Sequence, residues 1–112
     1  MYEERERYAP IIIIEHNTTG SFSLMLTDTH MVQHTDLFNE RGFEGGGYDW
    51  CAVAKQSVRA FEPDLEGRFG LDPEAGMFVA YGEDLEALQK LAECLHRAFH
   101  DRTLLALSLI HI

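Results

Sequence analysis

Two pairs of histidines have a spacing at which their side chains could share a metal ion. His30 and His34, and again His96 and His100, are four residues apart, which places two imidazole rings on one face of a helix. Two ligands do not complete a site, and no glutamate stands between the paired histidines to act as the base of a zinc protease. We therefore expect solvent-exposed histidines, no bound metal and no other cofactor.

A run of three glycines precedes Tyr48, Asp49 and Trp50 in the segment FEGGGYDW, residues 43–50. A phosphate-binding loop of the P-loop type needs a lysine and a hydroxyl residue at the helix start, and the dinucleotide motif needs a third glycine that this segment lacks. The glycines are instead expected to allow a sharp turn, after which Asp49 caps a helix and Trp50 enters the core. Tyr48 and the exposed loop carrying Glu44 are candidates for contacting a partner.

The residue types of covalent and acid–base catalysis are present without the arrangements that these reactions need. Ser21, Ser23 and Ser57 lack the sequence pattern of an activated serine, and the many carboxylates single out no acid and base pair. Cys51 and Cys94 are far apart and form no CxxC motif, which favours buried free thiols over a disulfide. The sequence therefore predicts that the protein is not an enzyme.

Hydrophobic periodicity predicts the elements that position these residues. Four isoleucines at 11–14 predict a central strand covered on both faces, and the alternating residues 21–27 predict its hairpin partner. A short helix is expected from Thr35, with Thr35 or Asp36 at its N-cap and Gly42 in the left-handed position after its end. A second helix is expected over residues 49–61. Its apolar stripe comprises Trp50, Val53, Ala54, Ser57, Val58 and Phe61.

The second half of the sequence predicts another hairpin and a long helix. Residues 69–71 and 77–81 read as strands around a DPEAG turn. Asp84 is expected to cap the helix that follows. The order ββααββα indicates an α+β fold, in which a four-stranded antiparallel sheet from two hairpins has helices packed on it. The apolar stripe of the long helix comprises Leu85, Leu88, Leu91, Ala92, Leu95 and Phe99.

The charge balance favours a cationic partner. The chain has 9 lysines and arginines against 19 aspartates and glutamates, and its formal net charge of -10 repels nucleic acid and anionic membranes. We expect a cytoplasmic protein, because the sequence lacks an apolar run of membrane-spanning length and starts with charged residues. From spacing alone, the acidic residues fit either a face that orients a basic protein or a surface that only keeps the chain soluble.

The segments RGFEGGGYDWCAVA and LDPEAGMFVAYGEDLEALQKLAECL together resemble the immunity protein 51 family of bacterial polymorphic toxin systems. The resemblance extends over about residues 11–99. It implies a non-catalytic protein that binds a cognate toxin domain and neutralises it, and the acidic balance fits a basic toxin such as a nuclease whose active site would be blocked. The alternative is an intracellular protein-interaction or regulatory domain with no toxin partner.

The resemblance transfers no residue roles, so the candidates for contacting the toxin come from charge, aromatic character and position. They are Glu44, Tyr48, Asp49, Trp50, Glu83 and Asp84. If the four acidic members steer the partner, reversing their charges should slow association and weaken its dependence on salt.

The end of the sequence has a feature that bears on the domain boundary. Residues 107–112, LSLIHI, are what the DNA sequence CTGTCTCTTATACACATC encodes, and this DNA resembles a transposon end used in preparing sequencing libraries. We expect residues 1–106 to form a single domain and residues 107–112 to be an adaptor-derived tail that is not native. On this interpretation His111 has no function and the apolar tail is no membrane anchor.

Overall fold

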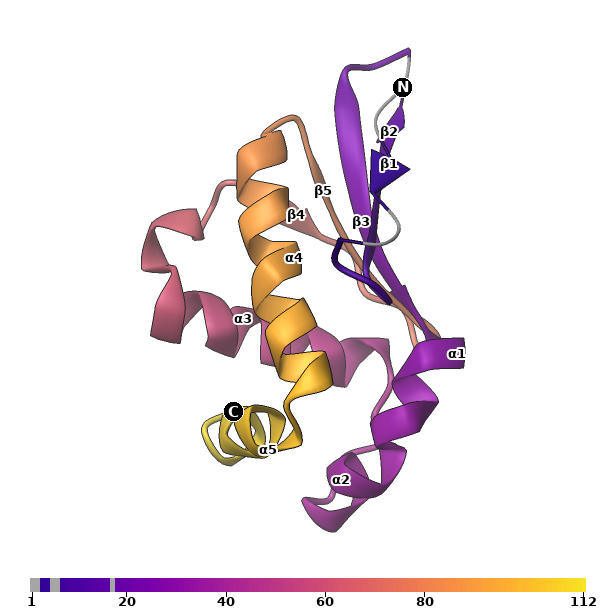
Figure 1. Cartoon of the computed structure of the whole chain (residues 1–112), viewed down its shortest axis with the longest axis vertical. Helices are drawn as coiled ribbons and strands as arrows, with labels where there is room; N and C mark the ends of the chain where they lie inside the picture. The colour runs from indigo at the N-terminus through magenta and orange to yellow at the C-terminus, as the bar shows by residue number, and fades with distance from the viewer. Residues whose placement is uncertain (1–2, 5–6, 17) are drawn as a thin grey trace.

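One antiparallel sheet carries helices on one of its faces, as the computed structural model shows for residues 3–4, 7–16 and 18–112 (Figure 1). Within these residues the sheet has five strands in the order β1-β2-β3-β5-β4. The strands are β1 Glu3–Glu4, β2 Ile12–His16, β3 Ser21–Thr27, β4 Gly70–Leu71 and β5 Met77–Gly82. The helical elements are α1 Asp28–Met31, η1 Val32–His34, α2 Thr35–Glu40, α3 Gly47–Phe61, η2 Pro63–Leu65, α4 Leu85–His100 and α5 Arg102–Ile110.

The predicted α+β architecture is confirmed. The two predicted hairpins are β2–β3 and β4–β5, and the antiparallel pair β3–β5 joins them into one sheet. The two predicted helices after the first hairpin are α2 and α3, and the predicted long helix is α4. Elements beyond the predicted order are the two-residue strand β1, the short helical turns α1, η1 and η2, and the final helix α5.

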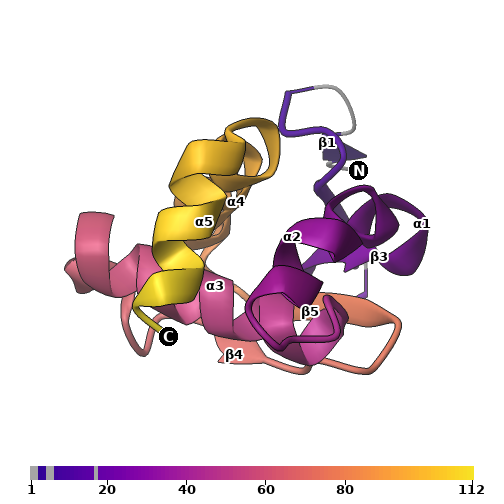
Figure 2. The same cartoon turned by 90° about the horizontal axis from the view of Figure 1, so that it is seen from below.

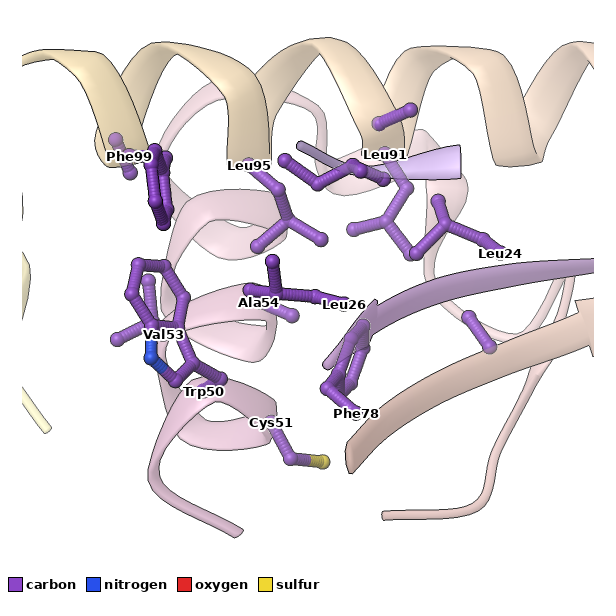
Figure 3. Close-up of a cluster of buried hydrophobic side chains, with 14 of the residues drawn as sticks. Leu24, Leu26, Trp50, Cys51, Val53, Ala54, Phe78, Leu91, Leu95 and Phe99 are labelled. Carbon is purple, nitrogen blue, oxygen red and sulfur yellow. The ribbon is translucent and has the colours of Figure 1, made fainter. Parts of the chain in front are cut away.

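The core lies between the sheet and the helices α3 and α4 (Figure 3). Leu24 and Phe78 from the sheet, Trp50 from α3 and Leu91 from α4 are each fully buried. Burying a large apolar side chain contributes about 1.5–3 kcal/mol to folding, so this layer contributes much of the stability. Phe61 was expected in the apolar stripe of α3 together with Trp50, but its side chain is 49% exposed. The reason is that the C-terminal end of α3 extends away from the sheet (Figure 1).

The prediction that residues 11–14 form a strand covered on both faces is wrong. Ile11 and Ile13 are fully buried on the helical side, whereas Ile12 and Ile14 are only half-buried on the other side. The reason is that α3, α4 and α5 all lie on the same side of the sheet, as Figure 2 shows from below. The four isoleucines therefore divide between a core face and an open face, which a run of identical residues does not indicate.

The ends of the short helix α2 agree only partly with the sequence prediction. Gly42 follows the helix in the left-handed conformation, with φ 83°, as predicted. The prediction that Thr35 or Asp36 is the N-cap is wrong, because His34 occupies this position without a side-chain cap hydrogen bond. The turns α1 and η1 run directly into α2, so α2 has no separate extended residue before it.

Helix α5 includes part of the segment that was expected to be a tail. Asp101 caps the helix by accepting hydrogen bonds from the N–H groups of Thr103 and Leu104, both at 3.1 Å. Leu105 and Leu109 are buried in the core. The adaptor origin of residues 107–112 stays a prediction, and in this structure their helical part packs with the domain. Among the helices of the described residues, none is both long and apolar enough to span a membrane.

Candidate functional site

The glycine loop, residues 42–47, packs directly on the β4–β5 hairpin. The N–H group of Gly47 donates a hydrogen bond of 3.0 Å to the carbonyl oxygen of Ala75. A Cβ atom on Gly46 would lie 2.6 Å from the same oxygen, and one on Gly47 would collide with backbone carbonyl groups of the hairpin. Gly45 has a φ of 87°, which side chains other than hydrogen rarely allow. The glycines therefore provide the predicted turn, and they also allow a close approach of two backbones, which was not predicted.

Asp49 stabilises this loop, but from a position other than the predicted one. The N-cap of α3 is Gly46 and the helix begins at Gly47, so the prediction that Asp49 is the cap is wrong by three residues. Asp49 instead lies in the first turn, where its Oδ2 atom accepts a hydrogen bond of 2.7 Å from the N–H group of Gly45. A carboxylate in this position also interacts favourably with the positive end of the helix dipole.

Three of the six predicted contact residues line one groove beside the glycine loop. Glu44, Tyr48 and Asp49 surround a groove of about 310 Å³ together with Gly42, Phe43, Gly46 and Ala75. Tyr48 is 63% exposed, and Glu44 is exposed as well. The groove thus presents an aromatic ring and carboxylates beside a loop that a backbone hydrogen bond joins to the β4–β5 hairpin.

Further carboxylates lie near this groove, and we call the combined set the acidic end: Asp28, Glu44, Asp49, Asp72 and Glu74. Asp28 begins α1, and its N–H group donates a hydrogen bond of 2.9 Å to the carbonyl oxygen of Gly76. Asp72 and Glu74 belong to the connection between β4 and β5, whose carbonyl groups also contact the glycine loop. Both views show this connection beside the segment that enters α3 (Figures 1 and 2).

Within the described residues, no carboxylate of the acidic end forms an ion pair. Asp36, Asp84, Glu86 and Glu93, which do form ion pairs, lie elsewhere in the molecule. Arg41 precedes the glycine loop and forms no ion pair with the acidic end among these residues. This end therefore offers negative charge to a partner at little cost in broken contacts. The β3–β5 pairing brings Asp28 beside the hairpin.

Glu83 and Asp84, the remaining acidic candidates, lie at the other end of β5. The strand begins at Met77, beside the acidic end, and finishes at Gly82, which corresponds to roughly 17 Å at the usual rise per residue. The six candidates therefore do not form one surface. Glu44, Tyr48 and Asp49 come together, and Glu83 and Asp84 form a second, separate group.

Asp84 has structural partners that occupy its carboxylate. It is the N-cap of α4, as predicted, and its Oδ1 atom accepts a hydrogen bond of 3.1 Å from the N–H group of Ala87. Its Oδ2 atom accepts one of 2.9 Å from Nε of Arg68, which also contacts Glu86. The hydrogen bond from Arg68 is the main reason that the pKa of Asp84 is lowered. Asp84 is therefore a weaker candidate for steering a partner than the members of the acidic end.

Trp50 is fully buried, which supports its expected place in the core, while a role in contacting a partner stays a prediction. Its ring packs against Phe38, Phe99 and His34 at centroid distances of 5.4, 5.8 and 6.1 Å. Because these rings come from the α2 region and from α4, Trp50 connects three parts of the chain. The expectation that it enters the core is confirmed.

His34 contradicts the expectation of exposed histidines. Its side chain is buried, its ring meets the edge of Phe99 at 4.5 Å, and its Nδ1 atom lies 3.2 Å from a guanidinium nitrogen of Arg102. Since arginine can only donate, Nδ1 accepts, and the neutral ring carries its proton on Nε2. Burial is the main cause of a lowered pKa for His34. This histidine is a neutral core residue next to the ion pair between Arg102 and Asp36.

The other helical histidine pair contacts the backbone. His96 and His100 approach the carbonyl oxygen of Ala9 at 3.1 and 2.7 Å, and both rings must donate because a carbonyl only accepts. In the part of the chain that the structure describes, no group of three or more histidine, cysteine, aspartate or glutamate side chains is arranged to hold a metal ion. The pair instead attaches the segment before β2 to α4.

Cys51 and Cys94 are buried free thiols, which confirms the sequence prediction. Burial raises the pKa of Cys51, and it raises the pKa of Cys94 to about 11. Since the thiolate is the nucleophilic form, neither side chain is activated for covalent chemistry at neutral pH. The two cysteines pack as small apolar residues.

Comparison with known protein families gives one finding. The family model described as Immunity protein 51 matches residues 11–111. The matched region includes the glycine loop, the acidic end, the strands β2 to β5 and all of α5. No curated protein and no solved structure matches the chain.

Proposed function

Because the chain belongs to the immunity protein 51 family, we propose that it neutralises its cognate toxin by binding over the active site of the toxin domain. Membership of this family implies toxin neutralisation, a toxin partner and the absence of catalysis. The identity of the toxin and the blocking mechanism are the parts that we propose. The acidic end is the observation that supports them.

A basic cleft is the toxin surface that fits the acidic end. Glu44, Asp72 and Glu74 are exposed, and within the described residues no cation neutralises them. An enzyme that cleaves nucleic acid binds the phosphate backbone through cations, so carboxylates can occupy the same positions and exclude the substrate. We therefore propose a basic nuclease as the toxin class.

Tyr48 adds the apolar contact that such an interface needs. Steering charges increase the rate of association more than they increase final affinity, whereas a partly exposed aromatic side chain can anchor the complex. Tyr48 extends from the first turn of α3 beside the acidic groove. The proposed interface therefore combines long-range attraction with a rigid aromatic anchor.

We propose that the protein acts in the cytoplasm, where a nuclease would meet its substrate. The formal net charge of -10 disfavours direct binding to nucleic acid and to anionic membranes. Protection of the nucleic acid would then come from the complex with the toxin alone.

Co-expression with the toxin tests the function. Cells that express the toxin encoded next to this chain should survive when the chain is present and die when it is absent. Cells that express an unrelated toxin should die even when the chain is present. Purified chain should also inhibit the cognate toxin at a ratio near one to one. Unchanged killing by the adjacent toxin would remove the proposal and leave the alternative of an interaction domain without a toxin.

Charge reversal tests the contribution of the acidic end. The double variant Glu44→Lys with Glu74→Lys should reduce the association rate with the toxin roughly tenfold at low salt, and it should weaken the dependence of this rate on ionic strength. Stopped-flow fluorescence with an inactivated toxin measures both quantities. Asp49 and Asp84 are left unchanged because they stabilise helix starts.

A matched control separates a local effect from a change in net charge. Asp64→Lys with Glu66→Lys alters the total charge by the same amount at two exposed residues in and after η2. These residues follow the far end of α3, whose 15 residues span roughly 22 Å. The control variant should change the association rate with the toxin much less than the acidic-end variant does. Equal rates for the two variants would show that the acidic end has no special role.

A further inference from the structure

The sheet has a second face, opposite α3, α4 and α5 (Figure 2), and many of its side chains are apolar. Strand pairing aligns Ile12, Met25 and Val79 in one row across three strands, and Ile14, Ser23 and Tyr81 in the next. Met77 is paired with Thr27 beyond the first of these rows. We call the apolar members the open sheet face: Ile12, Ile14, Met25, Met77, Val79 and Tyr81.

These six side chains differ sharply from their neighbours on the same strands. Ile13, Leu24 and Ala80, which alternate with them, are fully buried beneath the helices. All six members of the open sheet face remain partly exposed, and Tyr81 is 49% exposed. None belongs to the buried core or to the partly buried side chains packed against it. The open sheet face is therefore a separate apolar surface.

The composition of this face is unusual for one that meets only water. Antiparallel sheets commonly place apolar residues on the core side and polar residues on the solvent side. Ser21, Ser23 and Thr27 of β3 and His16 of β2 follow this rule, but isoleucine, methionine, valine and tyrosine side chains of β2, β3 and β5 also lie there. Contiguous apolar surface on a folded domain marks a site of interaction with another molecule.

The charges around the face indicate the kind of partner. The strands β2, β3, β4 and β5 contain no lysine or arginine. At one border, β3 continues directly from Thr27 into Asp28, and β5 begins at Met77 shortly after Glu74. The open sheet face is thus continuous with the acidic end.

Resting on the proposed function, we propose that the toxin domain docks on the open sheet face, with its basic cleft against the acidic end. The partner surface has apolar side chains at its centre and lysines or arginines along one border. A second copy of this chain fits less well, because it also carries a formal net charge of -10 and offers no excess of cations to the acidic end. The open sheet face provides the apolar contact area, and the carboxylates of the acidic end attract and orient the toxin domain.

Polar substitutions on the open sheet face test this docking surface. The cross-strand pair Met25 and Val79 is replaced by Met25→Gln with Val79→Gln, and Tyr81→Gln is prepared separately. Binding to the adjacently encoded toxin domain, inactivated in its own active site, is measured by surface plasmon resonance. We expect a rise in Kd of about 30-fold or more for each variant, mainly through faster dissociation.

The control and the outcomes distinguish this inference from the proposed function. Phe61→Gln removes an aromatic side chain that is also 49% exposed, but at the far end of α3, and its Kd should stay within about twofold. Circular dichroism establishes whether each variant is folded. If the double variant does not fold, Tyr81→Gln alone tests the docking surface. Unchanged Kd for folded face variants would overturn the docking surface alone. A dimer of the free chain that these substitutions dissociate, without effect on toxin binding, would also overturn it. Absence of binding by the unmodified chain would overturn the proposed function.

Discussion

Replacing Gly47 by alanine is expected to destabilise the fold by about 3 kcal/mol or more, enough to leave a large unfolded fraction in a domain of ordinary stability. The added Cβ atom would collide with the carbonyl oxygens of Glu74 and Met77. These are backbone atoms of the β4–β5 hairpin, so no side-chain rotation can relieve the collision. Gly47 lies within α3 and has no positive φ, which means that the penalty is steric rather than conformational. Urea denaturation followed by circular dichroism measures the loss.

Gly76→Ala is the matched control for this prediction. Gly76 belongs to the same hairpin connection and also lacks a positive φ, but a Cβ atom there would lie 3.4 Å from a carboxylate oxygen of Asp28. This side chain is exposed and can move, so the change in stability should remain below about 1 kcal/mol. If Gly47→Ala proved as stable as Gly76→Ala, the close packing of the glycine loop on the hairpin would be refuted.

Truncating Trp50 to alanine should cost about 3–5 kcal/mol of stability, since an indole in a well-packed core leaves a large cavity. Trp50 is fully buried, and its ring packs at a tilt against the rings of Phe38 and Phe99. Figure 3 shows its ring facing Phe99 of α4 across the core. The truncation therefore removes contacts that join α3 to α4, and the free energy of unfolding from urea denaturation reports their loss.

Trp50→Phe provides a milder substitution at the same position. Phenylalanine retains an aromatic ring, and it removes the Nε1 atom, which is buried without a hydrogen-bond partner among the described residues. Because an unpaired buried donor is itself unfavourable, the loss of stability should be less than half of that for Trp50→Ala. A loss below about 1 kcal/mol for Trp50→Ala would contradict the central position of this side chain.

The parts of the fold that local periodicity encodes were predictable from the sequence. Alternation around Leu24 identified β3, and helical spacing identified the buried faces of α3 and α4. Asp84 was recognised as a cap because an aspartate immediately before an amphipathic segment satisfies the free N–H groups of the first turn. In each case the determining interactions lie within a few residues along the chain.

The parts that depend on long-range packing were not predictable in the same way. A run of isoleucines does not reveal that all major helices choose one face of the sheet, so the exposure of Ile12 and Ile14 was missed. The β3–β5 pairing brings Asp28 close to Glu74 although they are far apart in sequence, and Asp28 was therefore not singled out. Glu83, by contrast, was grouped with Glu44 on charge alone, whereas the length of β5 separates them.

His34 illustrates a limit of spacing arguments. Its separation from His30 by four residues fits a helical surface equally well whether that surface faces water or the core. Burial of His34 results from aromatic contacts with α4 and from Arg102 in α5, elements distant in sequence. Only the tertiary arrangement determines its environment.

The outermost strands also affect how the protein behaves when no partner is bound. A sheet with an apolar face would readily polymerise if long, flat edges offered unpaired backbone groups to neighbouring molecules. In the described residues β1 and β4 are two residues each, and beyond β4 the turn folds back so that Asp72 and Glu74 bond to β5. At the β4 border, an incoming strand would find few free N–H and C=O groups. Fibre growth is thereby discouraged while the apolar face remains accessible.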